Sequence, residues 1–394
     1  FSPTFRIIIR AFLFLGCAFL LVQAYFFCSD YMEYRSEIDV RLNHEMAPFP
    51  AVTLCSIDSS EYSQVGEKNS RTELAFRTNI SVQQFVLSCT FNREPCDLIS
   101  DFLPTGHFDE CVTYNFNRSV VKRTGQPGSE YGLRLLLNTS RNGSSEPGAV
   151  RVHVHEQGTK PLPAQFGQNL PSGMSSSLSF RRKVNRRIGK PYGLCNNREL
   201  LDGYDYSREG CFSDCLQVLL QRACGCMHPG YAPVNYNYED NRTCSTDEEW
   251  ACVKLEGRYA FDLSYNHVDG FYYDCECFPA CHEVVYETTS TSNALPSTIS
   301  ICTDNEGSES GKKKECTEHK SSEATLIEVF SEQSHYEVLQ ERVAYPLSRL
   351  LTDLGRNAVL IVLTVLVAVM MPVKRKEERL GNREERIALS EPCN

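Results

Sequence analysis

Cysteine is the residue type in this sequence whose spacing most clearly implies chemistry. Ten of the nineteen cysteines lie within the 87 residues from 195 to 281. They are Cys195, Cys211, Cys215, Cys224, Cys226, Cys244, Cys252, Cys275, Cys277 and Cys281. Thiols at this density either bind a metal as thiolates or close disulfides that replace a large hydrophobic core. The redox compartment decides between the two, so the rest of the chain must first indicate where these cysteines are.

Zinc binding and catalysis are both poorly supported. Cys224-x-Cys226-x-His228 offers zinc ligands by type, with one residue between neighbouring ligands. Structural zinc sites usually have two to four residues between paired ligands and occur in reducing compartments. Residues 307–312 resemble a phosphate-binding loop, yet three residues separate the glycines where four are required. Neither Gly-x-Ser-x-Gly nor His-Glu-x-x-His occurs. We therefore expect no metal site, no cofactor and no enzyme.

The charge balance argues against a nucleic-acid partner. The formal net charge is −10, whereas a nucleic-acid binder needs a basic face. Residues 177–190 are basic, but they alternate like a strand with a solvated cationic face. We therefore expect no nucleic acid among the partners.

An apolar segment near the start of the chain predicts a transmembrane helix. Residues 11–27 contain no charge, and Ile7–Ile9 extend the stretch to about 20 residues, enough for a hydrocarbon core of about 30 Å. A secretory signal peptide is the alternative; the length, Gln23 and the lack of a small-x-small cleavage site before Cys28 disfavour it. Because the chain begins with Phe, residues 1–10 are interpreted as a truncated cytoplasmic N-terminus.

A second apolar segment predicts a second transmembrane helix, at residues 356–373. After Asn357 it is apolar apart from Thr364. Its apolar part covers about 24 Å as a helix, so a full crossing also needs residues 350–355. A buried core helix is the alternative. The run of Lys and Arg that follows favours a membrane helix with a cytoplasmic tail at residues 374–394.

Glycosylation triplets support an extracellular location for the region between the two segments. Five Asn-x-Ser/Thr triplets lie there and none lies in the tails. They begin at Asn79, Asn117, Asn138, Asn142 and Asn241. From Cys55 to Cys316 there are sixteen cysteines, an even number that suits complete pairing in an oxidising space. We therefore expect residues 28–355 to be extracellular, both termini cytoplasmic, and the protein in the plasma membrane.

Hydrophobic periodicity predicts an α+β extracellular domain. Alternating and β-branched stretches predict strands. These lie at residues 48–55, 131–138, 150–155, 177–190, 284–286 and 326–330. Helical spacing predicts helices at residues 82–87, 212–224 and 247–255. Two of these helices lie inside the cysteine run, and a polar insertion with Cys302 and Cys316 follows it.

Four separated motifs, in order, resemble one family of membrane channels. They are Phe49-Pro-Ala-Val-Thr-Leu-Cys55, Arg187-x3-Pro191-Tyr-Gly-x-Cys195, the ten-cysteine run, and Ala344-Tyr-Pro-Leu-Ser-Arg-Leu-Leu-Thr-Asp-Leu-Gly355. Together they resemble the degenerin, epithelial sodium channel and acid-sensing ion channel family. The resemblance covers roughly residues 10 to 355.

The resemblance implies one disulfide pairing out of the many that the cysteine count allows. The implied pairs are Cys55–Cys111, Cys89–Cys96, Cys195–Cys281, Cys211–Cys277, Cys215–Cys275, Cys224–Cys252 and Cys226–Cys244. Cys302 and Cys316 are left over and are expected to pair within their insertion. Five of these pairs would join two antiparallel helices into the rod-like thumb of the family, at residues 195–281.

The resemblance also implies a fold and a function. The fold is an α+β membrane protein with two transmembrane helices flanking a disulfide-rich extracellular domain, a palm-like β-sheet with a helical finger and thumb. The function is that of a subunit in a trimeric, stimulus-gated, sodium-selective channel. Thr352, Asp353 and Gly355 would lie at the pore mouth, where gating occurs. Expected partners are sodium ions, homologous subunits, the lipid bilayer and an extracellular ligand, either protons or a peptide.

The sequence departs from the family immediately after Gly355. Relatives continue with a second glycine and a Gly-x-Ser sodium filter, whereas this chain continues with Arg356, Asn357 and an unbroken apolar run. Apolar walls supply no ligands to replace the water around sodium. We therefore expect little or no sodium current from this chain alone. The alternatives are a non-conducting regulatory or dominant-negative partner subunit, and a ligand-binding cysteine-rich receptor ectodomain.

Overall fold

The chain folds into two compact units, each described here by itself. The computed structural model describes residues 3–57, 81–104, 111–140, 148–200, 203–228, 231, 242–266, 275, 277–304, 314–363, 365–366 and 370. The smaller unit comprises Phe1–Ile38, Pro191–Gly193 and Glu341–Asn394. The larger unit comprises Asp39–Lys190 and Leu194–Gln340.

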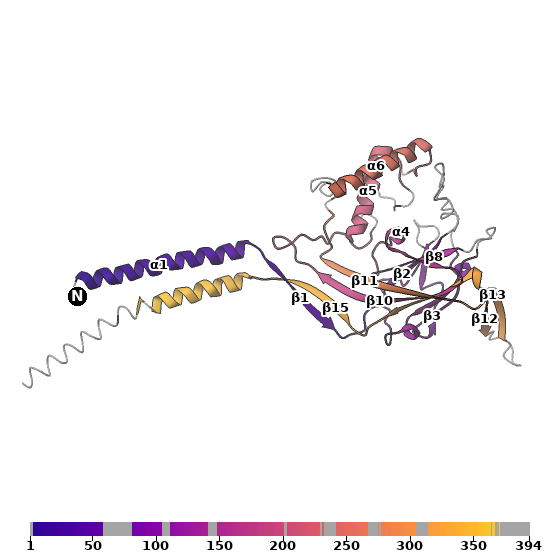
Figure 1. Ribbon diagram of the computed structural model, residues 1–394, viewed down its shortest axis with the longest axis horizontal. Helices are drawn as coiled ribbons and strands as arrows, with labels where there is room; N and C mark the ends of the chain where they lie inside the picture. Colours follow the sequence, from indigo (N-terminus) through magenta and orange to yellow (C-terminus); the bar gives the residue numbers. More distant parts are fainter. Residues whose placement is uncertain are drawn as a thin grey trace, which may run out of the picture. The chain divides into compact units, whose positions relative to one another are not determined.

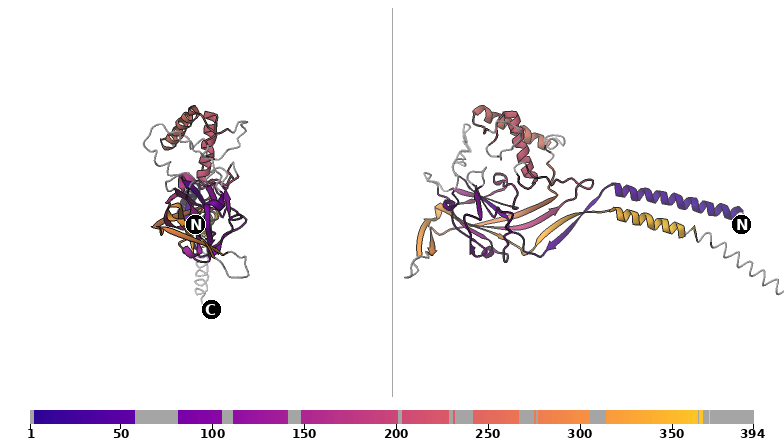
Figure 2. Two further views of the ribbon diagram at one scale, coloured as in Figure 1. Left: turned by 90° about the vertical axis from the view of Figure 1, so that its right-hand side faces the viewer. Right: turned by 180° about the vertical axis from the view of Figure 1, so that it is seen from behind.

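Two helices dominate the smaller unit and run alongside each other in both views (Figures 1 and 2). Helix α1 is Pro3–Met32, so it begins before and ends after the apolar segment 11–27. The second helix covers residues 347–363 and passes through Gly355 without a break. Within the described residues, one helical stretch, Phe14–Met32, is long and apolar enough to cross a membrane.

The larger unit is built mainly of strands, in three sheets. Its strands and the strands shared with the smaller unit are β1 (Ser36–Asn43), β2 (Ala51–Ile57), β3 (Val86–Phe91), β4 (Glu94–Pro95), β5 (Phe102–Pro104), β6 (Cys111–Tyr114), β7 (Leu133–Asn138), β8 (Ala149–His155), β9 (Gln168–Pro171), β10 (Met174–Arg186), β11 (His282–Ala294), β12 (Thr298–Asp304), β13 (Lys314–Lys320), β14 (Ala324–Ser331) and β15 (Tyr336–Val343). An eight-stranded sheet has the order β1-β15-β10-β14-β7-β3-β4, with β11 on the other side of β10. A five-stranded sheet has the order β5-β6-β2-β8-β9, and β12 pairs with β13 alone.

The long antiparallel pair β10–β11 is central to the larger sheet. Thirteen residues of each strand are in register, from Met174 opposite Ala294 to Arg186 opposite His282. On β10, Ser176, Leu178 and Phe180 are buried in alternation, as expected for a strand with one face on the core. Of the basic residues predicted as a solvated strand face, those up to Arg186 lie on β10, whereas Arg187 and Lys190 lie beyond its end. The Arg182 side chain is buried, at 9% exposed, so that part of the face is not solvated.

The hydrophobic core contains residues of both large sheets. Leu135 on β7, Phe180 on β10 and Ile327 on β14 belong to the same buried cluster as Leu54 on β2 and Val152 on β8. Alternation of apolar and polar residues directs one face of each strand into this cluster. The five-stranded sheet thus packs on the eight-stranded sheet through one common core.

Two helices, α5 (Arg208–Cys224) and α6 (Asp247–Asn266), carry much of the cysteine run and lie next to each other (Figure 1). Ser207 caps α5 by accepting a hydrogen bond from the Gly210 backbone N–H, and Gly225 ends it in the left-handed conformation at φ 67°. We call α5 and α6 the stapled helices. Helix α6 extends eleven residues beyond the predicted end at Leu255.

The predicted helix at residues 82–87 is partly wrong. Helix α3 covers only Val82–Phe85, and Val86 begins strand β3. The helical spacing of apolar residues there is overridden because β3 pairs with β7 and its Cys89 is bonded to Cys96. The other short helical segments named among the described residues are α4 (Pro163–Phe166) and the 3-10 turns η1 (Ser129–Tyr131) and η2 (Ser321–Glu323).

Candidate functional site

Five disulfides tie the cysteine run into a ladder. They are Cys195–Cys281, Cys211–Cys277, Cys215–Cys275, Cys224–Cys252 and Cys226–Cys244. Cys211 and Cys215 are four residues apart on α5, so both project from one helical face. They bond to cysteines two residues apart on the returning chain. These five pairs are the ones that the family resemblance implies.

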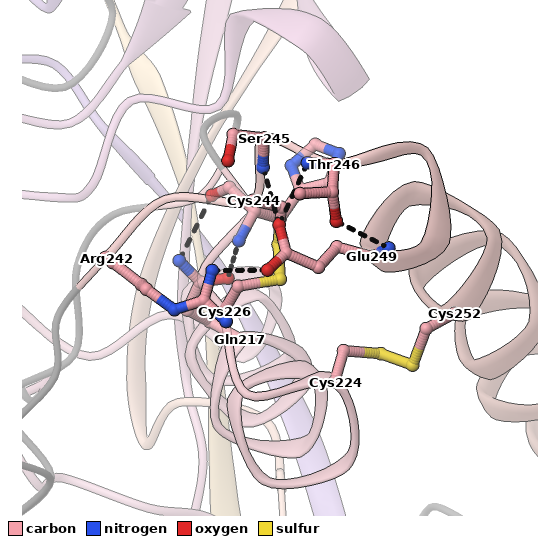
Figure 3. The surroundings of a disulfide bond; sticks show 10 residues. Gln217, Cys224, Cys226, Arg242, Cys244, Ser245, Thr246, Glu249 and Cys252 are labelled. Carbon is pink, nitrogen blue, oxygen red and sulfur yellow. Dashed lines mark hydrogen bonds and ion pairs between the residues drawn. A yellow bond between two sulfur atoms is a disulfide. The ribbon is translucent and has the colours of Figure 1, made fainter.

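The far end of the ladder is closed by a network around Glu249 (Figure 3). The Glu249 carboxylate accepts hydrogen bonds from the backbone N–H groups of Ser245 (2.8 Å) and Thr246 (3.0 Å), and it pairs with Arg242. The Thr246 hydroxyl accepts in return from the Glu249 N–H at 3.3 Å, which makes a capping box. These backbone hydrogen bonds, followed by Arg242, lower the pKa of Glu249 to about 2. The start of α6 is therefore fixed directly after Cys244.

The two remaining described disulfides lie in the β-rich part. Cys55 bonds to Cys111 across β2 and β6, and Cys89 bonds to Cys96 between β3 and the segment that follows β4. Both pairs are the ones that the resemblance implies. Residues Cys302 and Cys316 are register partners in the β12–β13 hairpin, and their bond stays a prediction. Among the described cysteines, Cys17 and Cys28 on α1 are free and exposed.

The predicted pore-mouth residues lie on the helix that starts at residue 347. Thr352 is exposed, and its hydroxyl donates to the Ser348 carbonyl at 2.8 Å. The Asp353 carboxylate accepts a hydrogen bond from the Tyr345 hydroxyl at 2.9 Å and pairs with Arg356 at 3.5 Å. Sequence reasoning missed both partners of Asp353. The i,i+3 spacing of Asp353 and Arg356 is the signal that indicates the ion pair.

An aromatic contact joins the end of α1 to the turn that enters the cysteine run. The ring of Tyr34 meets the ring of Tyr192 edge to face, with centroids 5.4 Å apart. Tyr31, one helical turn before, lies 6.0 Å from Tyr34. Tyr192 belongs to the Pro191-Tyr-Gly motif, so this motif both turns the chain and contacts the segment that follows α1.

Two of the five predicted glycosylation sites lie in described residues. Asn117 is exposed, and its side-chain oxygen accepts a hydrogen bond from the Ser119 N–H. Asn138 is half-buried at the end of β7, and its amide nitrogen donates to the Gln84 carbonyl at 3.3 Å. Asn79, Asn142 and Asn241 lie outside the described residues. Glycosylation stays a prediction at all five.

A mostly β unit with a disulfide ladder, in a chain that also contains a long apolar helix, is typical of membrane-anchored, disulfide-rich proteins. Comparison with known families identifies the chain more narrowly. The model of the amiloride-sensitive sodium channel family matches residues 66–362. The degenerin unc-8 of Caenorhabditis elegans is 32% identical over 295 residues, which are 71% of this chain and 37% of that protein. The degenerin deg-1 of the same organism is 34% identical over 287 residues, which are 70% of this chain and 36% of that protein.

The chain therefore belongs to the amiloride-sensitive sodium channel family, as the sequence motifs predict. It spans about a third of the length of the curated relatives it matches. A cryo-EM structure of a proton-activated chloride channel is similar at a TM-score of 0.36 and 6% identity, covering 94% of this chain and 98% of that one. A likeness at that level supports no conclusion about this chain.

Proposed function

We propose that this chain is a subunit of a trimeric, stimulus-gated cation channel of the plasma membrane that passes little or no sodium by itself. Family membership supports the channel role. The single observation that favours weak conduction is the state of Asp353, whose carboxylate is engaged by Tyr345 and Arg356. A carboxylate at a pore mouth attracts cations through its uncompensated charge. Pairing with Arg356 within one helical turn removes most of that attraction.

The continuity of the helix supports the same proposal. Residues 347–363 are helical throughout, including Gly355. In a continuous helix the backbone carbonyls bond to N–H groups four residues on and are not available to an ion. A sodium filter needs carbonyl or side-chain oxygens that replace water. Gly355 therefore does not open the helix in the way that a filter requires.

The stapled helices supply a stiff element through which a stimulus reaches the membrane. Disulfides at Cys211 and Cys215 fix α5 to the chain that returns at Cys275 and Cys277. The Pro191–Gly193 turn at the start of the cysteine run contacts Tyr34, two residues after the end of α1, through Tyr192. In the proposal, a ligand or force displaces the stapled helices, and the tyrosine contact passes the movement to α1.

Currents in a cell that lacks related channels test the proposal. The unmodified chain is expected to carry little sodium current alone, and replacing residues 356–371 with a family-type segment containing Gly-x-Ser is expected to restore it. In the restored chain, Asp353→Asn should lower the current. The exchange also removes Thr364, so a restored current would show that conduction does not require Thr364. A large sodium-selective current from the unmodified chain would contradict the proposal.

Co-expression separates this subunit role from its alternatives. A non-conducting regulatory partner changes the current of a co-expressed degenerin and co-purifies with it. A single-span ligand-binding receptor would place its two ends on opposite sides of the membrane. Epitope tags at Phe1 and Asn394 should both become accessible only after permeabilisation. A tag exposed on intact cells would favour the receptor.

Glycosidase treatment tests the extracellular assignment. Cell-expressed chain should lose mass on removal of N-linked glycans, since the triplets lie between the two apolar segments. Of the two described sites, Asn117 should be the more heavily modified because it is exposed, whereas Asn138 is half-buried. Unchanged mass would count against an extracellular location for residues 28–355.

A further inference from the structure

A cleft of about 820 Å³ opens in the larger unit. One wall is β8 with the loop that follows it, residues 152–162, and the opposite wall is residues 282–288 of β11. Residues 205–209, at the start of α5, form a third side. Pockets for small organic molecules measure about 300–1,000 Å³. The cleft is therefore large enough for such a ligand, and the stapled helices begin at its edge.

One side of the cleft is a stack of uncharged rings. Phe166 stacks on His153 with centroids 6.1 Å apart, and His153 stacks on His155 at 4.9 Å. The His153 Nδ1 accepts a hydrogen bond from the Leu162 N–H, and burial lowers the pKa of His153 well below its usual range. Burial likewise lowers the pKa of His155 to about 4. Phe166 ends this stack with 54% of its surface exposed, so a flat apolar face is open to a ligand.

Most charged side chains that line the cleft form ion pairs with residues outside its lining. Three carboxylates each pair with an arginine: Glu156 with Arg182 at 3.4 Å, Asp205 with Arg118 at 3.0 Å, and Glu283 with Arg187 at 2.6 Å. The lining lysine, Lys160, is only 2% exposed and pairs with Asp214 at 2.5 Å. These pairs leave the cleft with neither a strong positive nor a strong negative field of their own.

Glu209 is the exception. It lines the cleft from the first turn of α5, and no described residue forms an ion pair with it. A carboxylate in the first turn interacts favourably with the positive end of the helix dipole. The N-terminus of this helix is already capped by Ser207. The cleft therefore contains one uncompensated negative charge together with an exposed aromatic face. A metal ion is not indicated, because the described residues contain no cluster of three His, Cys, Asp or Glu ligands.

We propose that this cleft binds a monovalent organic cation with a flat apolar body, of the arylalkylammonium class. The ammonium group pairs with Glu209, and the ring of the ligand packs against the exposed face of Phe166, which ends the stack. Aromatic packing and a single charge pair are complementary contributions in such a pocket. Because the cleft adjoins α5, occupancy would bias the position of the stapled helices.

Binding of 2-phenylethylammonium to the full chain in detergent micelles tests the proposal, with 2-phenylethanol as its neutral counterpart. We expect the ammonium compound to bind more tightly than the alcohol. Glu209→Gln should weaken the ammonium compound about fivefold to tenfold, the effect of about 1 kcal/mol for a partly exposed charge pair, and should leave the alcohol unchanged. Glu248→Gln is the matched control, because Glu248 is exposed in the first turn of α6 and lies outside the cleft.

Two results would overturn the proposal: equal affinity for the ammonium compound and the alcohol, or unchanged ammonium affinity in Glu209→Gln. Phe166→Ala should weaken both compounds together, since it removes the apolar face and no charge. Should Glu209→Gln fail to fold, Val285→Cys offers a second measurement, since Val285 lines the cleft and is 37% exposed. A cationic methanethiosulfonate should modify it faster than an anionic one, and 2-phenylethylammonium should slow the reaction. Equal rates without protection would also refute the site.

Discussion

The β-rich part of the larger unit and the stapled helices are ordered by different means. Among described residues, the β-rich part has a buried cluster of nineteen apolar side chains and two disulfides. The cluster of the stapled helices has four buried residues, Leu220, Cys226, Cys244 and Val253, two of which are themselves disulfide-bonded. Burial of apolar area stabilises the first region, whereas covalent cross-links restrict the unfolded chain in the second.

The two kinds of stabilisation indicate which part of the larger unit can transmit a movement. A core that two sheets share resists deformation because its side chains interlock at high density. Two helices held by cross-links and few core residues can shift as one stiff body without disturbing that core. The buried Lys160–Asp214 pair links the two regions, joining the loop after β8 to α5. The comparison therefore predicts separate responses to damage in the two regions.

The largest expected effect is loss of the β core. Phe180→Ala removes a ring that is 1% exposed and contacts Phe49 and Tyr286. It should destabilise the protein by about 3–5 kcal/mol through the cavity that it leaves, and thermal unfolding should occur at lower temperature for the whole larger unit. Leu255→Ala, at a position 56% exposed on α6, is the control and should change little. Equal effects of the two would contradict the comparison.

Removing one disulfide should destabilise only the stapled helices, and by somewhat less than Phe180→Ala destabilises the β-rich part. The double change Cys226→Ser with Cys244→Ser should cost about 2–4 kcal/mol, seen as faster hydrogen exchange in residues 208–224 and 247–255. Exchange in β10 should stay slow. Cys226→Ser alone should be worse than the double change, because the remaining thiol can mispair during secretion. Faster exchange in β10 would mean that the two regions are not independent.

The capping box of α6 should contribute less than a disulfide. Thr246→Ala removes the hydroxyl that accepts from the Glu249 N–H and should cost about 1 kcal/mol. Hydrogen exchange should rise only in the first turn of α6. Thr246→Ser, which keeps the hydroxyl, is the control and should behave like the parent chain. An effect that reached α5 would show that the cap, and not the disulfides, holds the two helices together.

As the pH falls, the β-rich part should lose stability before the stapled helices do. Near neutral pH this is the smallest of the expected effects. Burial lowers the folded pKa of His155 to about 4 and lowers that of His153, so the unfolded chain binds more protons. Stability is then full above about pH 6.5 and falls as the pH drops toward 4. His228, beside the stapled helices, shifts in the same direction but is more exposed. Glu249, with its pKa lowered to about 2, loses its contribution only below about pH 4.5.

Hydrogen exchange of β8 at several pH values, corrected for the intrinsic rate, checks this window. His155→Gln should flatten the dependence in β8, since glutamine keeps polar contacts to Thr53 without a titrating ring. Glu249→Gln should leave β8 unaffected and weaken only the α6 start. A pH dependence of β8 that survived His155→Gln would place the sensitivity in His153 or elsewhere.

The family and several of the elements, but not β1, β3, β4, β5, β6, β9, β12, β13 or β15, were predictable from the sequence. Apolar runs, glycosylation triplets and an even cysteine count are local or additive features, so they can be read without a fold. Periodicity gave strands close to β7, β8, β10 and β14, and motif order gave the family that the comparisons confirm. The seven disulfides of the described residues agree with the pairing that the motifs imply, because a family fixes which cysteines meet.

Contacts between side chains that are far apart in the sequence follow from the tertiary fold. Glu156 and Tyr286 are 130 residues apart in sequence, and Lys160 and Asp214 are 54 apart. Such contacts depend on strand register and helix rotation, where a shift of one residue moves a side chain to the opposite face. The same holds for the end of α3, where pairing with β7 overrode local helical spacing. The cleft and its uncompensated Glu209 follow from these long-range placements, which no local pattern encodes.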